Sequence, residues 1–295
     1  MPRARLGDIE LEYEILGRSD GEPLLLVGGL GSQLISWDDE FCKELVDRRY
    51  RVIRFDNRDS GLSSGFDDRG VPDLLGLILG GAAAPYLLGD MAADAAALLH
   101  ALGVQRTHVV GLSLGGMIAQ LLAIDHPRLI ASVVAAMSGP PGRPASLPEP
   151  QVIDALLRPP GADFEERVDA AVELRRVLAG SADGFDDSLA RRRAESQLRR
   201  AYRPAGTMRQ AAAVLATPNR LRDLGQIHAP TMFVHGRLDP LVPFASAEAA
   251  ARAIRGASLI EMPALGHDLP AAAAMDMIEQ MEDFHRKVTQ AITRR

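Results

Sequence analysis

The chain has 295 residues, of which 47% are hydrophobic, and it carries a formal net charge of −6 at pH 7. A chain of this length suits a large sheet with an insertion better than one small domain. The acidic balance argues against nucleic-acid binding. The single cysteine, Cys42, excludes an internal disulfide, and the seven histidines are scattered along the sequence. We therefore expect neither a metal site nor a cofactor.

The N-terminus and the apolar stretches indicate the cellular location of the protein. The first residues lack the long apolar segment of a signal peptide, and a leader upstream of this sequence stays an alternative. Apolar runs are interrupted by Gly, Pro or Asp well before the ~20 residues that a membrane span needs. We expect a cytoplasmic protein without a membrane span, and the sequence leaves monomer and homodimer both open.

Short buried strands alternate with helical patterns along most of the chain. Strands are predicted near residues 9–16, 23–27, 51–55, 107–111, 129–137, 231–235 and 257–262. Helices are predicted near residues 38–47, 89–102, 115–126, 245–255 and 271–293. This alternation predicts an α/β fold, with a mostly parallel sheet that is covered by helices on both faces.

The alternation stops between residues 140 and 222. This stretch follows the predicted strand that ends at Met137, opens on a segment rich in Gly and Pro, and contains helical patterns only. We interpret residues 140–222 as a helical cap. Residues 1–139 and 223–295 then form the core into which the cap is inserted.

Ser113 lies in the sequence Gly111-Leu112-Ser113-Leu114-Gly115, between a predicted buried strand and a predicted helix. This is the context of a nucleophile elbow, in which a serine occupies a strained turn beside free backbone N–H groups. Side chains at Gly111 and Gly115 would collide with the adjoining strand and helix, which accounts for the two glycines. The alternative, a small residue in an ordinary tight turn, is weak in this context.

Two further predicted strands end in residues that suit a serine nucleophile. Asp239 and His267 each follow a predicted strand, so both are expected at the same edge of the sheet as Ser113. The order Ser, Asp, His along the chain is that of an α/β-hydrolase triad. The ordinary alternatives are a helix N-cap for Asp239 and a surface position for His267. Asp268 is a rival acid, but its place next to His267 in the sequence prevents it from facing the ring easily.

A glycine-rich loop, residues 28–32, follows the predicted strand 23–27. An oxyanion hole needs two N–H donors that point at the negative charge developing on the substrate. We expect these donors to be the backbone amides of Leu30, in this loop, and of Leu114, directly after the serine. A nucleotide-binding loop is the alternative, but neither G-x-G-x-x-G nor a P-loop lysine is present.

Two other polar segments are candidates for a functional role. For the turn at residues 56–61 we expect a structural role, with Asp56 and Arg58 paired or hydrogen-bonded within the turn. Residues 188–222 contain nine arginines against one acidic residue, Glu195. Attraction of an anionic substrate is one interpretation; we favour a solvated helix face that is paired with acidic residues elsewhere.

These motifs together resemble the α/β-hydrolase superfamily, and more closely the carboxylesterase group that includes aclacinomycin methylesterase. The resemblance runs from about residue 5 to the C-terminal helix and is weaker between about 140 and 222. It is carried by residues 24–29, Trp37, 52–63, 108–115 and 266–270. One departure is Gly28-Gly29 at the start of the oxyanion loop, where many relatives have His-Gly.

The resemblance implies an α/β-hydrolase fold with an eight-stranded sheet and a helical cap, although one N-terminal strand is not evident from the pattern. It implies Ser113 as nucleophile, Asp239 as the acid that orients the base, and His267 as the base. The Leu30 and Leu114 amides are the implied oxyanion donors. The expected activity is hydrolysis of a small-molecule carboxylic ester through an acyl-enzyme.

Other functions stay open at this point, because a fold does not fix a substrate. The same three residues serve C–C hydrolases, iminopeptidases, perhydrolases and acyltransferases. A non-catalytic binding module on the same scaffold is less favoured, since all three side-chain types of the triad are present.

Overall fold

The computed structural model describes residues 1–158, 161–180 and 185–293. Its centre is a sheet of eight strands in the order β1-β2-β4-β3-β5-β6-β7-β8. The pairs β1–β2 and β2–β4 are antiparallel, and the other neighbouring pairs are parallel. The strands are β1 (Arg3–Leu6), β2 (Ile9–Leu16), β3 (Glu22–Val27), β4 (Tyr50–Phe55), β5 (Thr107–Leu112), β6 (Ile130–Ala136), β7 (Thr231–Gly236) and β8 (Ser258–Met262).

Alternate side chains of the parallel strands enter two separate hydrophobic cores. Leu25 and Val27 of β3 belong to the larger core, and Leu24 and Leu26 belong to the smaller one. All four side chains are fully buried. Because successive side chains of a strand point to opposite faces, a strand that is apolar throughout requires cover on both faces of the sheet.

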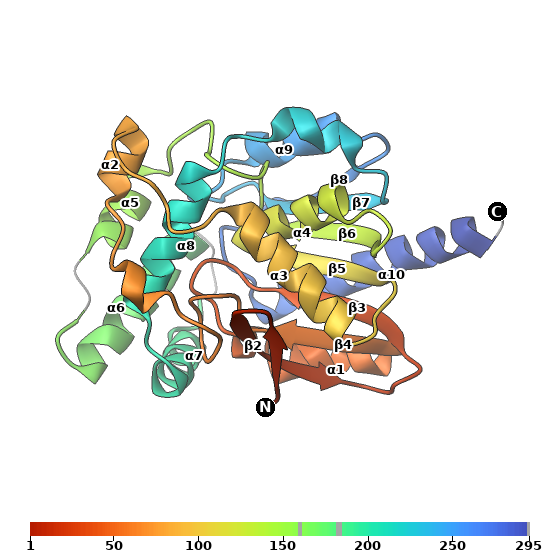
Figure 1. The fold of residues 1–295 in the computed structure, drawn as a ribbon, viewed down its shortest axis with the longest axis horizontal. Coiled ribbons are helices and arrows are strands. Elements are labelled where there is room, and N and C mark those ends of the chain that lie inside the picture. The colour runs from red at the N-terminus through yellow and green to blue at the C-terminus, as the bar shows by residue number, and fades with distance from the viewer. Residues whose placement is uncertain (159–160, 181–184, 294–295) are drawn as a thin grey trace.

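Helices supply this cover. Those of the described residues are α1 (Asp39–Asp47), α2 (Leu74–Leu79), α3 (Leu88–Ala101), α4 (Leu114–Asp125), α5 (Pro150–Leu157), α6 (Phe164–Ala179), α7 (Asp187–Arg200), α8 (Pro204–Ala216), α9 (Phe244–Ala253) and α10 (Ala271–Thr293). Helices α3, α4 and α9 pack on the larger core, and α1 and α10 pack on the smaller one. Figure 1 shows α3 and α4 in front of the sheet and α10 running behind it.

The N-terminal strand that the sequence pattern leaves undetected is β1. It spans Arg3–Leu6 and pairs with β2 in antiparallel register, with Leu6 opposite Ile9. Four residues are too few to show an alternating pattern clearly. With β1 the sheet has the eight strands that the resemblance implies, and the predicted α/β-hydrolase fold is confirmed.

Four helices, α5 to α8, lie in the sequence between β6 and β7, and no strand interrupts them within the described residues. Figure 1 places them together at the left of the sheet. They adjoin the carboxyl ends of the parallel strands: Gln210 of α8 contacts Gly31 after β3, and Leu178 of α6 contacts His267 after β8. The division into core and cap at residues 140–222 stays a prediction.

Helix α10 is 23 residues long and has one buried face, which includes Met277, Ile278 and Met281. Acidic and basic residues occupy much of its other face. No helix in the described part of the chain combines the length and the apolar composition that a membrane crossing needs.

Candidate active site

Ser113 occupies the sharp corner between β5 and α4. Its backbone angles, φ 53° and ψ −115°, lie outside the regions that residues with a side chain ordinarily adopt. The N–H of Ser113 donates to Ala136 O at 2.9 Å, and the hydroxyl of Ser138 donates to Ser113 O at 2.8 Å. Both partners lie at the end of β6, so the neighbouring strand holds the serine in its strained conformation.

The glycines on either side of Ser113 are required by close backbone contacts. A Cβ atom on Gly111 would lie 2.1 Å from the carbonyl oxygen of Gly115. A Cβ atom on Gly115 would lie 2.1 Å from Val27 O and 2.8 Å from Gly28 O. These oxygens are backbone atoms, which cannot move aside as a flexible side chain can. Gly115 therefore lets the start of α4 approach the end of β3 and its loop.

Asp239 and His267 are joined by a hydrogen bond. The loops after β7 and β8 bring His267 Nδ1 to 2.7 Å from Asp239 Oδ2. The other carboxylate oxygen, Oδ1, accepts the backbone N–H groups of Leu241 and Val242 at 2.9 and 2.8 Å. These bonds fix the carboxylate, and through it the plane of the imidazole.

The hydrogen bonds also decide the charge of Asp239. Burial alone raises the pKa of the carboxyl group, but hydrogen bonds from His235 and His267 outweigh it and lower the pKa to about 2. A carboxylate can only accept, so Nδ1 of His267 carries the proton that it donates to Asp239. The other ring nitrogen, Nε2, is then free of a proton in the neutral ring and can accept one.

Ser113 and His267 are not joined to each other in this state. Within the described residues, neither the Ser113 hydroxyl nor His267 Nε2 has a hydrogen-bond partner. The rival acid, Asp268, makes no hydrogen bond to His267 within the same residues. The structure thus joins two of the three predicted catalytic residues, and these two follow β7 and β8 at the sheet edge where Ser113 follows β5.

Two free amides flank the Ser113 corner. A Cβ atom on Gly29 would lie 3.6 Å from Ser113 Cβ, so the loop after β3 passes next to the serine. Over the described ranges, neither the Leu30 nor the Leu114 amide donates a hydrogen bond. Leu114 is the first residue of α4, where N–H groups lack partners within the helix. The described structure thus leaves both of these amides unpaired, and the loop that carries Leu30 adjoins Ser113.

Sequence reasoning missed the neighbours that hold the acid and the histidine in place. His235 ends β7, and its Nε2 lies 3.4 Å from Asp239 Oδ2 and 2.8 Å from Val242 O. Its position four residues before Asp239 was the available signal. The backbone N–H of His267 donates to Leu178 O, in the last turn of α6, at 2.7 Å. That contact had no sequence signal, because α6 lies in the stretch with the weakest resemblance.

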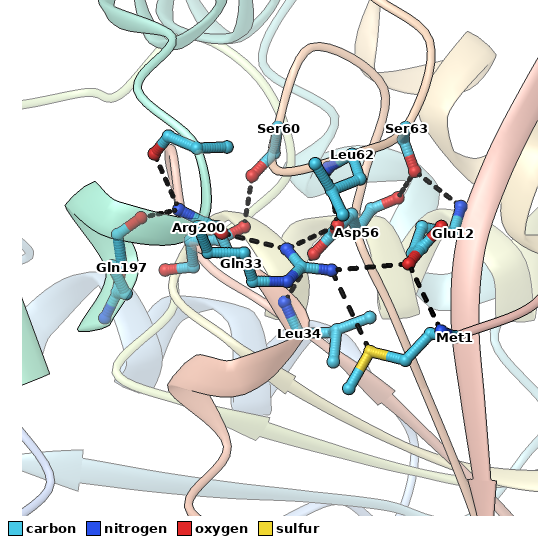
Figure 2. A network of polar contacts seen from close by, with 12 residues as sticks. Met1, Glu12, Gln33, Leu34, Asp56, Ser60, Leu62, Ser63, Gln197 and Arg200 are labelled. Atoms are coloured by element: carbon cyan, nitrogen blue, oxygen red, sulfur yellow. Dashed lines mark hydrogen bonds and ion pairs between the residues drawn. The ribbon is translucent and has the colours of Figure 1, made fainter.

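The turn at residues 56–61 has a structural role, but with other partners than expected. Figure 2 shows Asp56 accepting hydrogen bonds from the Leu34 and Leu62 amides and from Arg200 of α7. Arg58 instead pairs with Asp94 of α3, with one contact of 2.7 Å. The expected pairing of Asp56 with Arg58 is therefore wrong. Asp56 has one partner directly beside the turn, the Leu62 amide, and Arg58 pairs with Asp94 outside it.

The arginines of residues 188–222 are engaged mainly with acidic side chains. The ion pairs join Arg191 to Glu165, Asp169 and Glu195, Arg193 to Asp38, Arg200 to Asp56, Arg209 to Asp59 and Arg220 to Asp223. Arg199 lies over the ring of Phe164 at 4.6 Å. Pairing with acidic residues is confirmed for the five arginines with ion pairs. The expected solvated face is wrong for Arg209, whose side chain is fully buried.

Two cavities adjoin the loops of the candidate site. One of about 730 Å³ lies beside the His267 loop, between α6, α7 and α10, and its lining includes Gly266 and Asp268. One of about 690 Å³ lies beside the Asp239 loop and is lined in part by Leu241, Leu215 and Met117. Both are bounded in part by segments from residues 140–222, and Ser113, Asp239 and His267 are not among the lining residues of either cavity. Among the described residues, no three His, Cys, Asp or Glu side chains gather as metal ligands do.

Comparison with known proteins agrees with the geometry. The family model of the alpha/beta hydrolase fold matches residues 22–271, which is most of the chain. The chain therefore belongs to the alpha/beta hydrolase family, and it is an enzyme of the hydrolase class.

Individual relatives match over nearly the whole length. The chain is 34% identical over 289 residues to rhodomycin D methylesterase DauP of Streptomyces sp. (strain C5), covering 90% of this chain and 91% of the relative. It is 29% identical over 282 residues to a protein of Variovorax paradoxus (strain S110) that is named as a carbamate hydrolase, RutD, covering 95% and 97%. A hydrolase of Pseudomonas aeruginosa PA01 superposes with a TM-score of 0.71 at 27% identity, covering 98% and 97%.

Proposed function

We propose that this hydrolase is a serine esterase, which cleaves small-molecule carboxylic esters by means of Ser113, Asp239 and His267. The observation that carries the proposal is the 2.7 Å contact between His267 Nδ1 and Asp239 Oδ2. This contact leaves His267 Nε2 free to accept a proton. Ser113, in its strained turn, and the two unpaired amides lie at the same edge of the sheet. The similarity to a methylesterase supports an ester as the substrate.

The first half of the reaction transfers the acyl group to the enzyme. Ser113 Oγ attacks the ester carbonyl carbon while its proton passes to His267 Nε2. The Leu30 and Leu114 amides stabilise the negative oxygen of the tetrahedral intermediate. When this intermediate collapses, the C–O bond to the alcohol breaks, and the alcohol leaves with the proton from His267.

The second half returns the enzyme to its starting state. A water molecule attacks the acyl-enzyme carbonyl carbon and gives a proton to His267 Nε2. Collapse of the second intermediate releases the carboxylic acid, and the proton passes from His267 back to Ser113 Oγ. Asp239 stays ionised throughout and stabilises the imidazolium. The missing bond between Ser113 and His267 fits a free enzyme, because catalytic hydrogen bonds often tighten only when substrate binds.

We further propose that α5 to α8 act as the cap over this site. Support comes from the hydrogen bond between Leu178 and His267 and from the segments of residues 140–222 that bound both cavities. Such a cap sets the shape of the substrate and excludes water from the reacting atoms.

A fluorophosphonate probe tests the nucleophile. The wild-type protein is expected to become labelled at Ser113, as located by peptide mass spectrometry, and to hydrolyse p-nitrophenyl acetate. Ser113→Ala is expected to lose both, with a rate loss on the order of 10⁶-fold. Ser19→Ala, which changes an exposed serine distant in sequence from Ser113, is the matched control and is expected to keep both labelling and hydrolysis. Near-normal hydrolysis by Ser113→Ala would contradict the proposal.

Carbamate hydrolysis is the second candidate, because the RutD relative covers almost the whole chain. A pair of substrates with the same p-nitrophenol leaving group, one an acetate ester and one a carbamate, separates the two. We expect the larger kcat/KM for the ester. A clear preference for the carbamate, lost in Ser113→Ala, would keep the nucleophile and change the substrate class.

A further inference from the structure

Gln210 of α8 joins the glycine-rich loop to the turn after β4. Its side chain is fully buried. Its Oε1 accepts the backbone N–H of Gly31 at 2.8 Å, and its Nε2 donates to the carbonyl oxygen of Arg58 at 2.7 Å. One amide group therefore satisfies two backbone groups that lie far apart in the sequence. Neither bond has a role in the reaction as described above.

The bond to Gly31 acts on the part of the loop that carries the Leu30 amide. The Ser32 N–H donates to Gly29 O at 3.1 Å, so residues 29–32 form a β-turn with Leu30 and Gly31 at its centre. Gly31 has a φ of +66° and Leu30 does not have a positive φ, which is the pattern of a type II turn. In such a turn the central peptide, between Leu30 and Gly31, can flip. The Gln210 oxygen holds the N–H of this peptide, that of Gly31, in one orientation. The Leu30 N–H belongs to the preceding peptide, between Gly29 and Leu30, which is part of the same turn.

Helix α8 is itself fixed against the segment after β4. Arg209, next to Gln210, is fully buried and binds both carboxylate oxygens of Asp59 at 2.7 and 2.8 Å. A Cβ atom on Gly206 would lie 2.1 Å from Asp59 O. Thr207, one turn before Gln210, lies against Gly31, where a Cβ atom would be 2.7 Å from its hydroxyl oxygen. The face of α8 that carries Gln210 is thus in rigid contact with the loop.

The far end of the loop is held by a separate network. The Ser60 hydroxyl donates to Ser32 O at 2.5 Å, and the Leu34 N–H donates to Asp56 Oδ1 at 2.6 Å. Figure 2 shows the contact between Leu34 and Asp56. Gln33 bonds to Arg200 and to the carbonyl oxygen of Gln197, both from α7. These contacts hold residues 32–34. The peptide between Leu30 and Gly31 is held by Gln210 instead.

We propose that Gln210 is a positioning residue of the oxyanion hole, through which α8 fixes the turn of residues 29–32 that carries the Leu30 amide. This inference rests on the proposed esterase function. An oxyanion donor acts by being aimed in advance at the place where the charge develops, so a small displacement of the turn that carries it lowers the rate without weakening substrate binding. The helices of residues 140–222 then contribute to the chemistry as well as to the pocket.

Gln210→Met tests the role, because methionine has a similar length and forms neither hydrogen bond. The fraction of active enzyme is first counted by fluorophosphonate labelling at Ser113, and rates are expressed per active site. We expect kcat to fall about 10- to 100-fold with KM within about twofold of wild type. We expect the Ki of a trifluoromethyl ketone, which forms a tetrahedral oxyanion on the serine, to rise by the same factor.

Ala213→Gly is the matched control, since Ala213 is buried on the same helix and packs in the larger core. It is expected to lower the Tm while leaving kcat per active site and the Ki of the ketone unchanged. The same behaviour in Gln210→Met would show that Gln210 is only structural and would overturn the inference.

Gln210→Glu keeps the inference testable if Gln210→Met does not fold. A protonated glutamic acid reproduces both hydrogen bonds. The carboxylate loses the donor to Arg58 O and is repelled by that oxygen, which moves the side chain away from its place against the Gly31 N–H. We expect this variant to approach wild-type kcat at the acid end of the working range and to lose activity relative to wild type as the pH rises. A constant ratio of the two rates would contradict the role. Absence of labelling at Ser113 in the wild-type protein would instead remove the esterase function, and this role with it.

Discussion

His267 Nδ1 lies 2.7 Å from Asp239 Oδ2, although the two residues are 28 positions apart and follow different strands. This contact lets Asp239 dictate which ring nitrogen carries the proton. In Asp239→Asn the new amide can donate to Nδ1 and so favour the tautomer with the proton on Nε2, which cannot act as a base. We expect kcat to fall on the order of 10³- to 10⁴-fold, as measured with p-nitrophenyl acetate, with little change in the Tm.

Asp268→Asn is the control for that measurement. Asp268 is next to the histidine, yet it makes no hydrogen bond to it in the described part of the chain. Its substitution is expected to leave kcat within a few-fold of wild type. If kcat fell as much in Asp268→Asn as in Asp239→Asn, the assignment of Asp239 as the acid that orients His267 would be wrong.

The glycines of the Ser113 corner should tolerate no side chain. Gly115→Ala places a methyl group 2.1 Å from Val27 O, so the start of α4 and the end of β3 must separate. We expect the free energy of unfolding to fall by about 2–4 kcal/mol in urea denaturation. Gly89→Ala, in α3 with no atom within 4 Å of the new Cβ, should instead gain about 0.5–1 kcal/mol. Equal midpoints for the two variants would refute the steric explanation.

The sequence predicts the core of this fold well because its signals are local. A parallel strand that is buried on both faces is mainly apolar, as in β3, β5 and β6, and can be recognised without knowing its neighbours. Ser113 and Asp239 each follow a buried strand, and His267 follows the edge strand β8. The carboxyl ends of parallel strands meet at one edge of the sheet. The predicted contact between Asp239 and His267 therefore followed from the order of elements alone.

The parts that the sequence did not predict depend on long-range choice of partner. Asp56 and Arg58 are two residues apart, which suggested a local pair, whereas their actual partners are Arg200 and Asp94. Nothing local marks Gln210, since a glutamine inside a helix is ordinarily exposed. Such partners are decided by how α7 and α8 pack on the loops, and helical periodicity does not reveal that packing.

A buried pair of histidines should make the stability depend on pH. The rings of His108 and His285 are stacked with their centroids 4.0 Å apart, and Nδ1 of each bonds to a hydroxyl, of Ser132 and of Tyr50 respectively. Burial lowers the pKa of His108 to about 4 and that of His285 well below its ordinary value. Glu22, on the rim, lies 3.4 Å from His108 Nε2 but does not offset the effect of burial.

The sign of the effect follows from proton counting. Between about pH 6.5 and pH 4 the unfolded chain binds protons at these histidines and the folded chain does not, so the free energy of unfolding falls as the pH falls. For His108 alone the full loss is about 3 kcal/mol. Urea denaturation at pH 7 and pH 4.5 should show a smaller loss in His108→Gln than in wild type. His100→Gln, at an exposed position, should leave the loss unchanged, and an equal loss in all three proteins would exclude the buried pair as its source.

Arg209 and Asp59 form the buried ion pair that attaches α8 to the core. Both side chains are almost completely buried, and Asp59 also accepts from the Tyr86 hydroxyl at 2.8 Å. Removing the arginine alone leaves a buried carboxylate with neutral donors only. We therefore expect Arg209→Met to lower the free energy of unfolding by about 3–5 kcal/mol. Because Gln210 follows directly on α8, this variant should also lower kcat per active site.

A double-mutant cycle separates the ion pair from simple packing. Asp59→Asn removes the buried charge, so Arg209→Met combined with Asp59→Asn should be more stable than Arg209→Met alone. Arg191→Met supplies the surface comparison: Arg191 is 41% exposed and paired with exposed acids, and its loss should cost no more than about 1 kcal/mol. If the Arg209→Met effect were unchanged by Asp59→Asn, the arginine would stabilise α8 by packing and not through its charge.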